Sequence, residues 1–244
     1  MSLDHITIVL NKPRYSENIG ASARAMLNMG ISKLIVVEPL EYDLSKVSKM
    51  ATHVAADVVK NIAIYDSLRV ALSPFGYIIG TTARTGKKRE TRKSISKVFE
   101  KIINISQNNE IAILFGPENK GLSSADLRLC HEVITIPTCD FSSLNLAQAV
   151  MIACYEFFSA SMNKDTEEFV PRLATRFELD PMYDELKDIM IKISFIKADN
   201  ADYWMKGLRD FFTRINITAK EVKMIRGICR QINWYGQKRL EPRG

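Results

Sequence analysis

The sequence contains few residues that build metal or disulfide sites, and it has no long apolar run. Only four cysteines and three histidines occur among 244 residues, and no two cysteines form a CxxC pair. We therefore expect free thiols in a reducing compartment and no metal site. No apolar run approaches the roughly 18 residues that cross a bilayer, and the chain does not open with a signal-peptide pattern. These absences predict a cytoplasmic protein that binds neither metal nor membrane.

Two common nucleotide-binding motifs are also missing. No GxGxxG follows a predicted strand, which removes the main sequence argument for a dinucleotide-binding enzyme. The segment 116–123 has the glycine spacing of a phosphate-binding loop, but Leu122 stands where that loop requires lysine. Without this ammonium group the loop cannot neutralise a β- or γ-phosphate, so the sequence argues against a nucleotidase.

Positive charge is present in excess and is unevenly distributed. The formal net charge is +6. Six Lys and Arg residues lie within 84–93, where only Glu90 opposes them, and ten Lys and Arg face three Asp and Glu from Tyr203 to the end. A single exposed cation is usually only solvated, whereas clustered cations bind phosphates. The two basic clusters therefore favour a nucleic-acid partner.

Strand-like and helix-like segments alternate up to about residue 161. The predicted strands are 6–10, 34–37, 62–65, 77–81, 111–115 and 133–136. The predicted helices are a first one ending at Gly30, then 46–60, 68–72, 94–103 and 144–161. This alternation predicts an α/β fold with a mostly parallel sheet covered by helices on both faces.

The composition changes near residue 162. The segment 163–168 is polar and charged, and Pro171 and Pro181 interrupt the residues after it, which is typical of a linker. Helical patterns then cover 183–196, 201–213 and 218–237. We expect a first domain at 1–162, and then a linker and a small helical C-terminal extension at 163–244.

Three segments with polar residues or glycine lie at predicted strand–helix junctions: Asn18–Arg24, Phe115–Leu122 and Ile136–Gln148. An open parallel sheet has its ligand crevice at such junctions. Backbone groups at the ends of strands 77–81, 111–115 and 133–136 would suit an adenine edge and a ribose, although ordinary strand-to-helix turns give the same pattern.

Each polar residue of these segments also has a structural interpretation. Small apolar residues flank Arg24, so we expect its guanidinium to face the crevice, while most arginines lie over their own helix. Glu118 is more often a plain loop carboxylate, and Asn145 serves equally well as a helix cap. Ser142 or Ser143 is the natural N-cap of the next helix.

Together the three segments resemble the motifs of the SpoU/TrmH-type RNA 2'-O-ribose methyltransferases of the SPOUT superfamily. The matching patterns are the spacing from Asn18 to Arg24, FGPExxGL at 115–122 and SLNLAxAV at 143–150. The segments 81–84, 195–197, 208–214 and 225–228 further resemble the TrmJ type, which methylates cytidine or uridine at tRNA position 32. One departure is Pro117, where some TrmJ-type proteins carry arginine.

The resemblance implies a C-terminal trefoil knot in the α/β domain, a homodimer, S-adenosyl-L-methionine as cofactor and tRNA as partner. It implies cofactor contacts at Thr81, Thr82, Ala83, Gly116, Ile136, Ser142, Ser143 and Leu144. It also implies that Arg24 stabilises the developing alkoxide first and accepts the proton second, because free arginine has a pKa above roughly 12. Asn18, Glu118 and Asn145 would orient Arg24 and the ribose.

Two alternative functions stay open at this point. One is 2'-O-methylation of ribosomal RNA or of another tRNA position, and the other is a non-catalytic RNA-binding SPOUT protein. The basic segment 84–93 and the basic helical tail are the expected contacts for tRNA.

Overall fold

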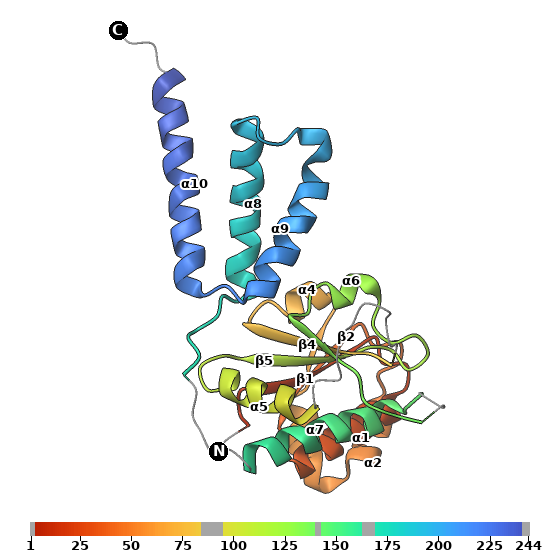
Figure 1. Ribbon diagram of the computed structural model, residues 1–244. Coiled ribbons are helices and arrows are strands. Elements are labelled where there is room, and N and C mark those ends of the chain that lie inside the picture. The colour runs from red at the N-terminus through yellow and green to blue at the C-terminus, as the bar shows by residue number, and fades with distance from the viewer. Residues whose placement is uncertain (1–2, 84–94, 140–142, 163–168, 241–244) are drawn as a thin grey trace. The chain divides into compact units, whose positions relative to one another are not determined.

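The computed structural model describes residues 3–83, 95–139, 143–162 and 169–240 (Figure 1). The chain divides into two compact units, Met1–Pro171 and Arg172–Gly244. The sequence predicts a domain boundary at residue 162, shortly before this division. The predicted phosphate contacts of segment 84–93 and the predicted cofactor contact of Ser142 lie outside the described residues.

Unit 1 is built on a six-stranded sheet in the order β3-β2-β1-β5-β4-β6, and each hydrogen-bonded pair of strands is parallel. The strands are β1 (Ile6–Asn11), β2 (Lys33–Val37), β3 (Ala63–Tyr65), β4 (Tyr77–Thr81), β5 (Ile111–Phe115) and β6 (Glu132–Ile134). This confirms the predicted α/β fold with a mostly parallel sheet.

Helices connect these strands and cover the sheet. They are α1 (Ser16–Asn28), α2 (Leu44–Ala51), the 3-10 helix η1 (His53–Ala55), α3 (Ala56–Lys60), α4 (Leu68–Ala71), α5 (Ile95–Ser106), α6 (Ser124–Leu127) and α7 (Leu146–Met162). Figure 1 shows α4 and α6 on one side of the sheet and α1, α5 and α7 on the other. Buried strands of this kind need both faces covered, because their side chains are apolar in both directions.

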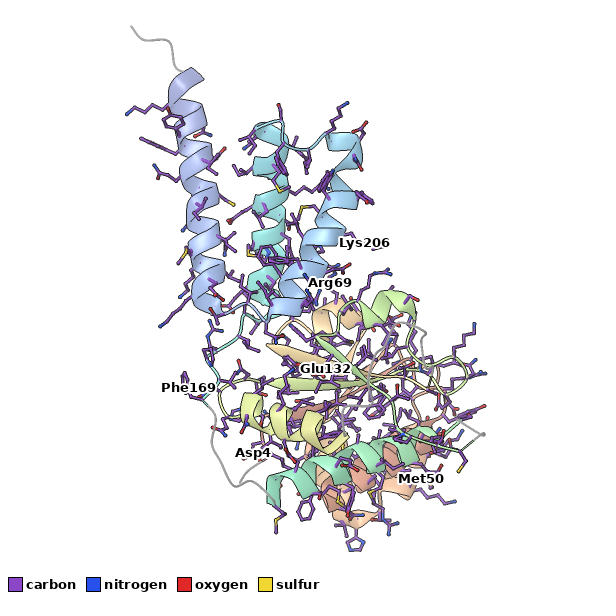
Figure 2. All side chains as sticks on the ribbon, in the orientation of Figure 1. Asp4, Met50, Arg69, Glu132, Phe169 and Lys206 are labelled. Carbon is purple, nitrogen blue, oxygen red and sulfur yellow. The ribbon has the colours of Figure 1, made fainter. Side chains whose placement is uncertain are left out.

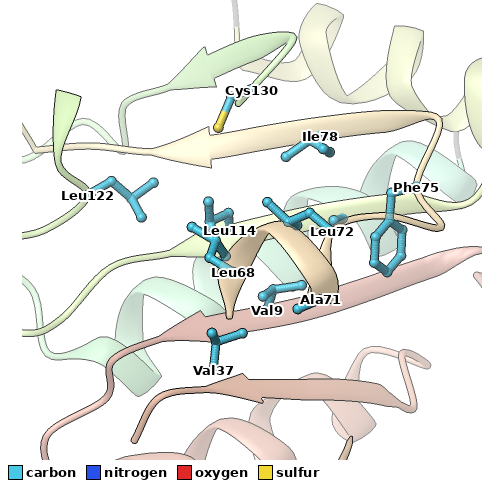
Figure 3. Packing of buried hydrophobic residues seen from close by; sticks show 11 residues of the cluster. Val9, Val37, Leu68, Ala71, Leu72, Phe75, Ile78, Leu114, Leu122 and Cys130 are labelled. Atoms are coloured by element: carbon cyan, nitrogen blue, oxygen red, sulfur yellow. The ribbon is translucent and has the colours of Figure 1, made fainter. Parts of the chain in front are cut away.

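One layer of the core lies between α4 and the sheet (Figure 3). Leu68 and Leu72 pack there against Val9 of β1, Leu114 of β5 and Ile78 of β4. The strand residues are fully buried. Packing across three strands fixes where those strands end, and the candidate site lies at those ends.

A polar cluster lies at the opposite, amino ends of β4 and β6. The Tyr77 hydroxyl donates to Glu132 Oε2 at 2.8 Å, and Lys101 Nζ donates to both partners at 3.0 Å. Figure 2 labels Glu132 within this region. Burial raises the pKa of Tyr77 above its usual value, with the Glu132 carboxylate as a second cause, so the phenol stays protonated and donates.

Two predicted elements of unit 1 are corrected. The predicted helix 46–60 is interrupted after Ala51, because Thr52 adopts a left-handed φ of 63° that stops the helical hydrogen bonding. The predicted strand 133–136 ends at Ile134. Gly30 follows the end of α1 with a φ of 76°, as the predicted C-terminal stop requires.

Unit 2 contains α8 (Arg176–Lys192), the 3-10 helix η2 (Ala198–Asn200), α9 (Ala201–Ile215) and α10 (Ala219–Leu240). Leu179, Met182, Tyr183, Met205, Ile217 and Val222 belong to its own buried core. The interpretation of Pro181 as a linker residue is wrong, since it lies inside α8. A capping box of Thr175 and Glu178 begins this helix, and this TxxE pattern is a local signal for a helix start ahead of the proline.

The four cysteines are free, as the composition predicts. Cys130, Cys154 and Cys229 are buried free thiols, and Cys139 is exposed and free. None of the described helices is both long and apolar enough to cross a membrane. Within the same residues, no group of His, Cys, Asp and Glu side chains is arranged to hold a metal ion.

Candidate active site

The strand order brings distant parts of the chain to one edge of the sheet. β1 pairs with β5, although about a hundred residues separate them, and the chain leaves β1 toward β2 on the other side. In an open α/β sheet, the crevice outside the carboxyl ends of such strands is the usual ligand site. The loops after β1 and β5 meet at this position.

A hydrogen-bond network connects three loops there. Glu118, after β5, accepts from Asn18 Nδ2 through Oε1 at 2.7 Å. Its other oxygen, Oε2, accepts from the backbone N–H of Arg14 at 2.9 Å. Asn145 Nδ2 donates to Asn18 Oδ1 at 3.0 Å. Asn18 therefore bonds directly to two of the other three residues implied as catalytic, Glu118 and Asn145.

Asn145 also caps α7. Its Oδ1 accepts from the backbone N–H of Ala147 at 2.9 Å, and its own N–H donates to Gln148 Oε1 at 3.3 Å. Because α7 begins at Leu146, Asn145 occupies the cap position, and the expected capping by Ser143 is wrong. Asn145 caps α7 and bonds to Asn18 at the same time, because its amide has separate donor and acceptor groups.

A cavity of about 320 Å³ lies beside this network. Its lining includes seven of the eight residues implied as cofactor contacts: Thr81, Thr82, Ala83, Gly116, Ile136, Ser143 and Leu144. The eighth, Ser142, lies outside the described residues. Because β6 ends at Ile134, the backbone after it is released from the sheet and brings Ile136 to the cavity wall.

Close backbone packing shapes the cavity. A Cβ at Gly116 would lie 2.3 Å from the backbone nitrogen of Leu122 and 2.4 Å from the carbonyl carbon of Gly121. Only glycine fits such an approach. On the β4 side, Thr81 Oγ1 donates to the Leu114 carbonyl at 3.0 Å, and the Thr82 N–H donates to the Ile134 carbonyl at 3.0 Å. These contacts hold the strand ends at fixed positions.

A second cavity of about 480 Å³ adjoins the first. The two share Glu118, Ser143 and Leu144 in their linings. The second is also lined by Tyr15, Glu17, Asn18 and Asn145. Two molecules bound in these cavities would therefore lie next to each other beside Glu118. A group transfer needs its two reactants held in such proximity.

Arg24 lies elsewhere. It is exposed on α1, and the linings of these two cavities do not include it. Seven residues separate it from Glu17, so both lie on one helix face about 10 Å apart along the axis. The expectation that the Arg24 guanidinium faces the crevice is therefore not met within a single chain. Gly20, in the same segment, serves packing, because a Cβ there would lie 2.1 Å from the Val47 carbonyl oxygen of α2.

Sequence reasoning missed Tyr15 and Arg14. Tyr15 lines the second cavity with half of its surface exposed, and Arg14 holds Glu118 through its backbone. Their signal was position alone, since both precede the predicted helix in the loop after the first strand.

Comparisons with known proteins identify the family of this chain. Residues 5–155 match the model of the SpoU rRNA Methylase family. Residues 177–243 match the model described as tRNA methyltransferase TrmJ, C-terminal domain. The first match covers the sheet and both cavities, and the second covers most of unit 2.

Individual relatives match over nearly the full length. The tRNA (cytidine/uridine-2'-O-)-methyltransferase TrmJ of Pectobacterium atrosepticum is 32% identical, covering 94% of this chain and 97% of its own. The tRNA (cytidine/uridine/adenosine-2'-O-)-methyltransferase TrmJ of Pseudomonas aeruginosa is also 32% identical, covering 94% of each. The crystal structure of TrmJ from Z. mobilis ZM4 has a TM-score of 0.77 at 27% identity, covering 93% of this chain and 98% of its own. The chain therefore belongs to the SpoU methylase family of RNA 2'-O-methyltransferases, and within that family to the TrmJ type.

Proposed function

We propose that this enzyme transfers a methyl group from S-adenosyl-L-methionine to a ribose 2'-hydroxyl of tRNA, at cytidine or uridine 32 of the anticodon loop. The observation that carries the proposal is the network of Glu118, Asn18 and Asn145 between two adjoining cavities. The matches to the SpoU model and to the TrmJ C-terminal model support the reaction and the tRNA class.

The first cavity is the proposed cofactor site. Its walls combine apolar Ile136, Leu144 and Leu146 with the backbone of 116–121, where Gly116 lets the loop pack tightly against its own backbone. Such a mixture suits an adenosine, with its flat base and its hydroxyl groups. When bound, S-adenosyl-L-methionine supplies an electrophilic methyl group on a sulfonium centre.

The second cavity is the proposed site of the target ribose, and Glu118 acts there as a positioning residue. Both of its carboxylate oxygens already accept hydrogen bonds, from Asn18 and from the N–H of Arg14. Taking a proton from the 2'-hydroxyl would compete with these bonds. Glu118 therefore orients Asn18, whose amide is fixed on its other side by Asn145.

We propose that Arg24 stabilises the developing negative charge and accepts the proton of the 2'-hydroxyl. It would do so in the partner subunit of a homodimer. α7 presents exposed apolar side chains at Ile152, Tyr155, Phe158 and Met162. Their spacing forms one helical stripe that a second copy of the chain would bury. α1 packs beside α7 (Figure 1), so Arg24 lies close to this surface and would approach the partner's cavities. As part of the same proposal, the C-terminal part of unit 1 forms the trefoil knot that the family resemblance implies.

Unit 2 is the proposed contact for the body of the tRNA. Cations and aromatic rings lie next to each other on its helices: Arg214 Cζ is 5.9 Å from the Phe211 ring centroid, and Lys238 Nζ is 5.0 Å from that of Trp234. Such pairs bind phosphates and stack on bases. The basic segment 84–93 would add phosphate contacts, and the working compartment would be the cytoplasm, where tRNA is modified.

The proposal is tested by methyl transfer from radiolabelled S-adenosyl-L-methionine to purified RNAs. Wild-type enzyme is expected to label tRNA transcripts and to lose this activity when nucleotide 32 carries a 2'-deoxyribose. Labelling of ribosomal RNA alone would favour the second candidate, which the SpoU rRNA Methylase description supports. Cofactor binding without transfer to either RNA would contradict the proposed reaction.

A further inference from the structure

The second cavity contains one aromatic side chain among its described lining residues. Tyr15 is 51% exposed, and its backbone is extended at the N-cap position of α1. An exposed tyrosine ring beside a polar network presents a flat apolar face to whatever enters the cavity. Nucleobases stack on such faces with little dependence on base identity.

Arg14 precedes Tyr15, and both its backbone and its side chain have contacts near the second cavity. Its backbone N–H donates to Glu118, which ties the loop to the network. Its guanidinium lies near the Tyr15 ring, with Cζ 5.8 Å from the ring centroid. The buried Nε of Arg14 has no hydrogen-bond partner among the described residues. The Arg14 side chain is therefore not neutralised at Nε, and an anion bound beside the Tyr15 ring would pair with the guanidinium charge.

Each side-chain oxygen of Glu118, Asn18 and Asn145 already accepts a hydrogen bond. Glu118 Oε1 and Oε2 accept from Asn18 and from the Arg14 backbone, Asn18 Oδ1 accepts from Asn145, and Asn145 Oδ1 accepts from Ala147. Reading a base edge needs free donors and acceptors in a fixed pattern. Here those acceptors are engaged; Tyr15, Glu17 and Ser143 also line the cavity, and the Arg14 guanidinium lies beside the Tyr15 ring.

We propose that Tyr15 stacks on the base of the nucleotide being methylated and that Arg14 binds the phosphate next to it. The target nucleotide is then held by ring contact and charge rather than by its base edge. This explains how one site would accept both cytidine and uridine, which differ in the donor or acceptor at position 4. The inference rests on the proposed function, since it needs RNA in the second cavity.

The test of Tyr15 is steady-state kinetics with tRNA transcripts. Tyr15→Ala is expected to raise KM for tRNA by about 5- to 150-fold, and Tyr15→Phe is expected to stay within about twofold of wild type. Neither variant should change the affinity for S-adenosyl-L-methionine, measured by calorimetry. Val70→Ala is the matched control, because Val70 is 56% exposed on α4 and lines neither cavity. If Tyr15→Phe loses as much as Tyr15→Ala, the hydroxyl matters and stacking is wrong.

The test of Arg14 is the salt dependence of tRNA binding. Arg14→Gln is expected to lower the slope of log Kd against log salt by about one, and Arg14→Lys is expected to preserve it. Lys60→Gln is the charge-matched control; Lys60 ends α3, before the amino end of β3, away from the cavities. An unchanged slope in Arg14→Gln would remove the phosphate contact.

Transcripts with cytidine or uridine at the target position complete the test. Wild-type kcat/KM is expected to agree within about tenfold between them, and a preference of about a hundredfold would mean that the base edge is read. These outcomes can be distinguished from a failure of the proposed function. If the wild-type enzyme methylates tRNA and Tyr15→Ala has the same kinetics as Val70→Ala, only the present inference is overturned. A wild-type enzyme that binds the cofactor and methylates no RNA overturns the proposed function.

Discussion

The two units of this enzyme differ in how their proposed functional groups are arranged. In unit 1, side chains from three separate loops are hydrogen-bonded to one another around two cavities. In unit 2, large apolar side chains face solvent, with Tyr203 74%, Met224 66% and Trp234 50% exposed. Chemistry needs groups fixed within fractions of an ångström, whereas binding a long polyanion needs area and charge. This difference supports the proposed reaction site in unit 1 and the proposed recognition surface in unit 2.

Arg24→Ala tests the reaction site most strongly. We expect methyl transfer to fall by about 100- to 1000-fold, the usual effect of removing one group that stabilises transition-state charge. Cofactor affinity should not change, because Arg24 lines neither cavity. Transfer assays and calorimetry on the same preparation measure both. Turnover near the wild-type rate would exclude Arg24 from the mechanism.

A mixed dimer then locates Arg24 relative to the cavities it serves. Gly116→Val should block the first cavity, because a side chain there meets the backbone at Leu122. A dimer of one Arg24→Ala subunit and one Gly116→Val subunit retains one complete site if Arg24 acts across the interface, and none if it acts within its own subunit. We expect about half of the wild-type activity, with each homodimeric variant as the inactive control.

Removing the residues after Pro171 separates the two units. We expect tRNA affinity to fall by about tenfold or more, because the exposed aromatic and basic surface of unit 2 is lost. The affinity for S-adenosyl-L-methionine should change by less than about twofold, measured by calorimetry. Equal losses of both affinities would show that unit 2 supports the fold of unit 1 instead.

Met182→Ala lowers the stability of unit 2 by removing a side chain from its buried core. Met182 is fully buried in its core, and truncating such a side chain costs about 2–5 kcal/mol of unfolding free energy. We expect the cofactor affinity of unit 1 to persist at temperatures where tRNA binding is already lost. Parallel melting followed by circular dichroism and by cofactor binding measures this. Simultaneous loss of both would indicate that the units unfold as one.

Glu178→Gln gives the smallest expected effect and depends on pH. The bond from Arg172 lowers the pKa of Glu178 below its ordinary value, with burial opposing and the Thr175 bonds adding to the effect. A lowered pKa means stability that is present above the unfolded value and lost as the pH falls through the folded one. We expect Glu178→Gln to cost roughly 0.5–1 kcal/mol at pH 7, because the pair is partly exposed.

Urea denaturation at several pH values measures this difference. The gap between wild type and Glu178→Gln should narrow below about pH 4, where the wild-type carboxyl also becomes protonated. Glu221→Gln is a useful comparison, since Glu221 accepts from the N–H and the hydroxyl of Thr218 in the same way at the start of α10, and Thr218 alone lowers its pKa. A gap that does not vary with pH would exclude the charge of Glu178 as its source.

The sequence alone determined the parallel α/β sheet, two of the three strand ends that carry the site, and the family, whereas the third strand ends at Ile134 and not at residue 136. Strand periodicity and glycine positions are local, so 77–81 and 111–115 were predicted with the observed bounds. The break at Thr52 and the helical position of Pro181 were not predicted, because tertiary packing outweighs such local preferences. Capping by Asn145 was an open alternative, since its side chain suits both a cap and a site.

Only the tertiary structure decided which polar groups meet. Glu118 and Asn18 are a hundred residues apart in the chain, and they bond because β1 and β5 pair in the sheet. Tyr15 and Arg14 carry no sequence motif. The position of Tyr15 at the second cavity and the bond from the Arg14 backbone to Glu118 depend on the turn that joins β1 to α1. Arg24 carries a motif and yet lines neither cavity of its own chain. Residue type is local information, whereas the direction of a side chain depends on the packing of its helix.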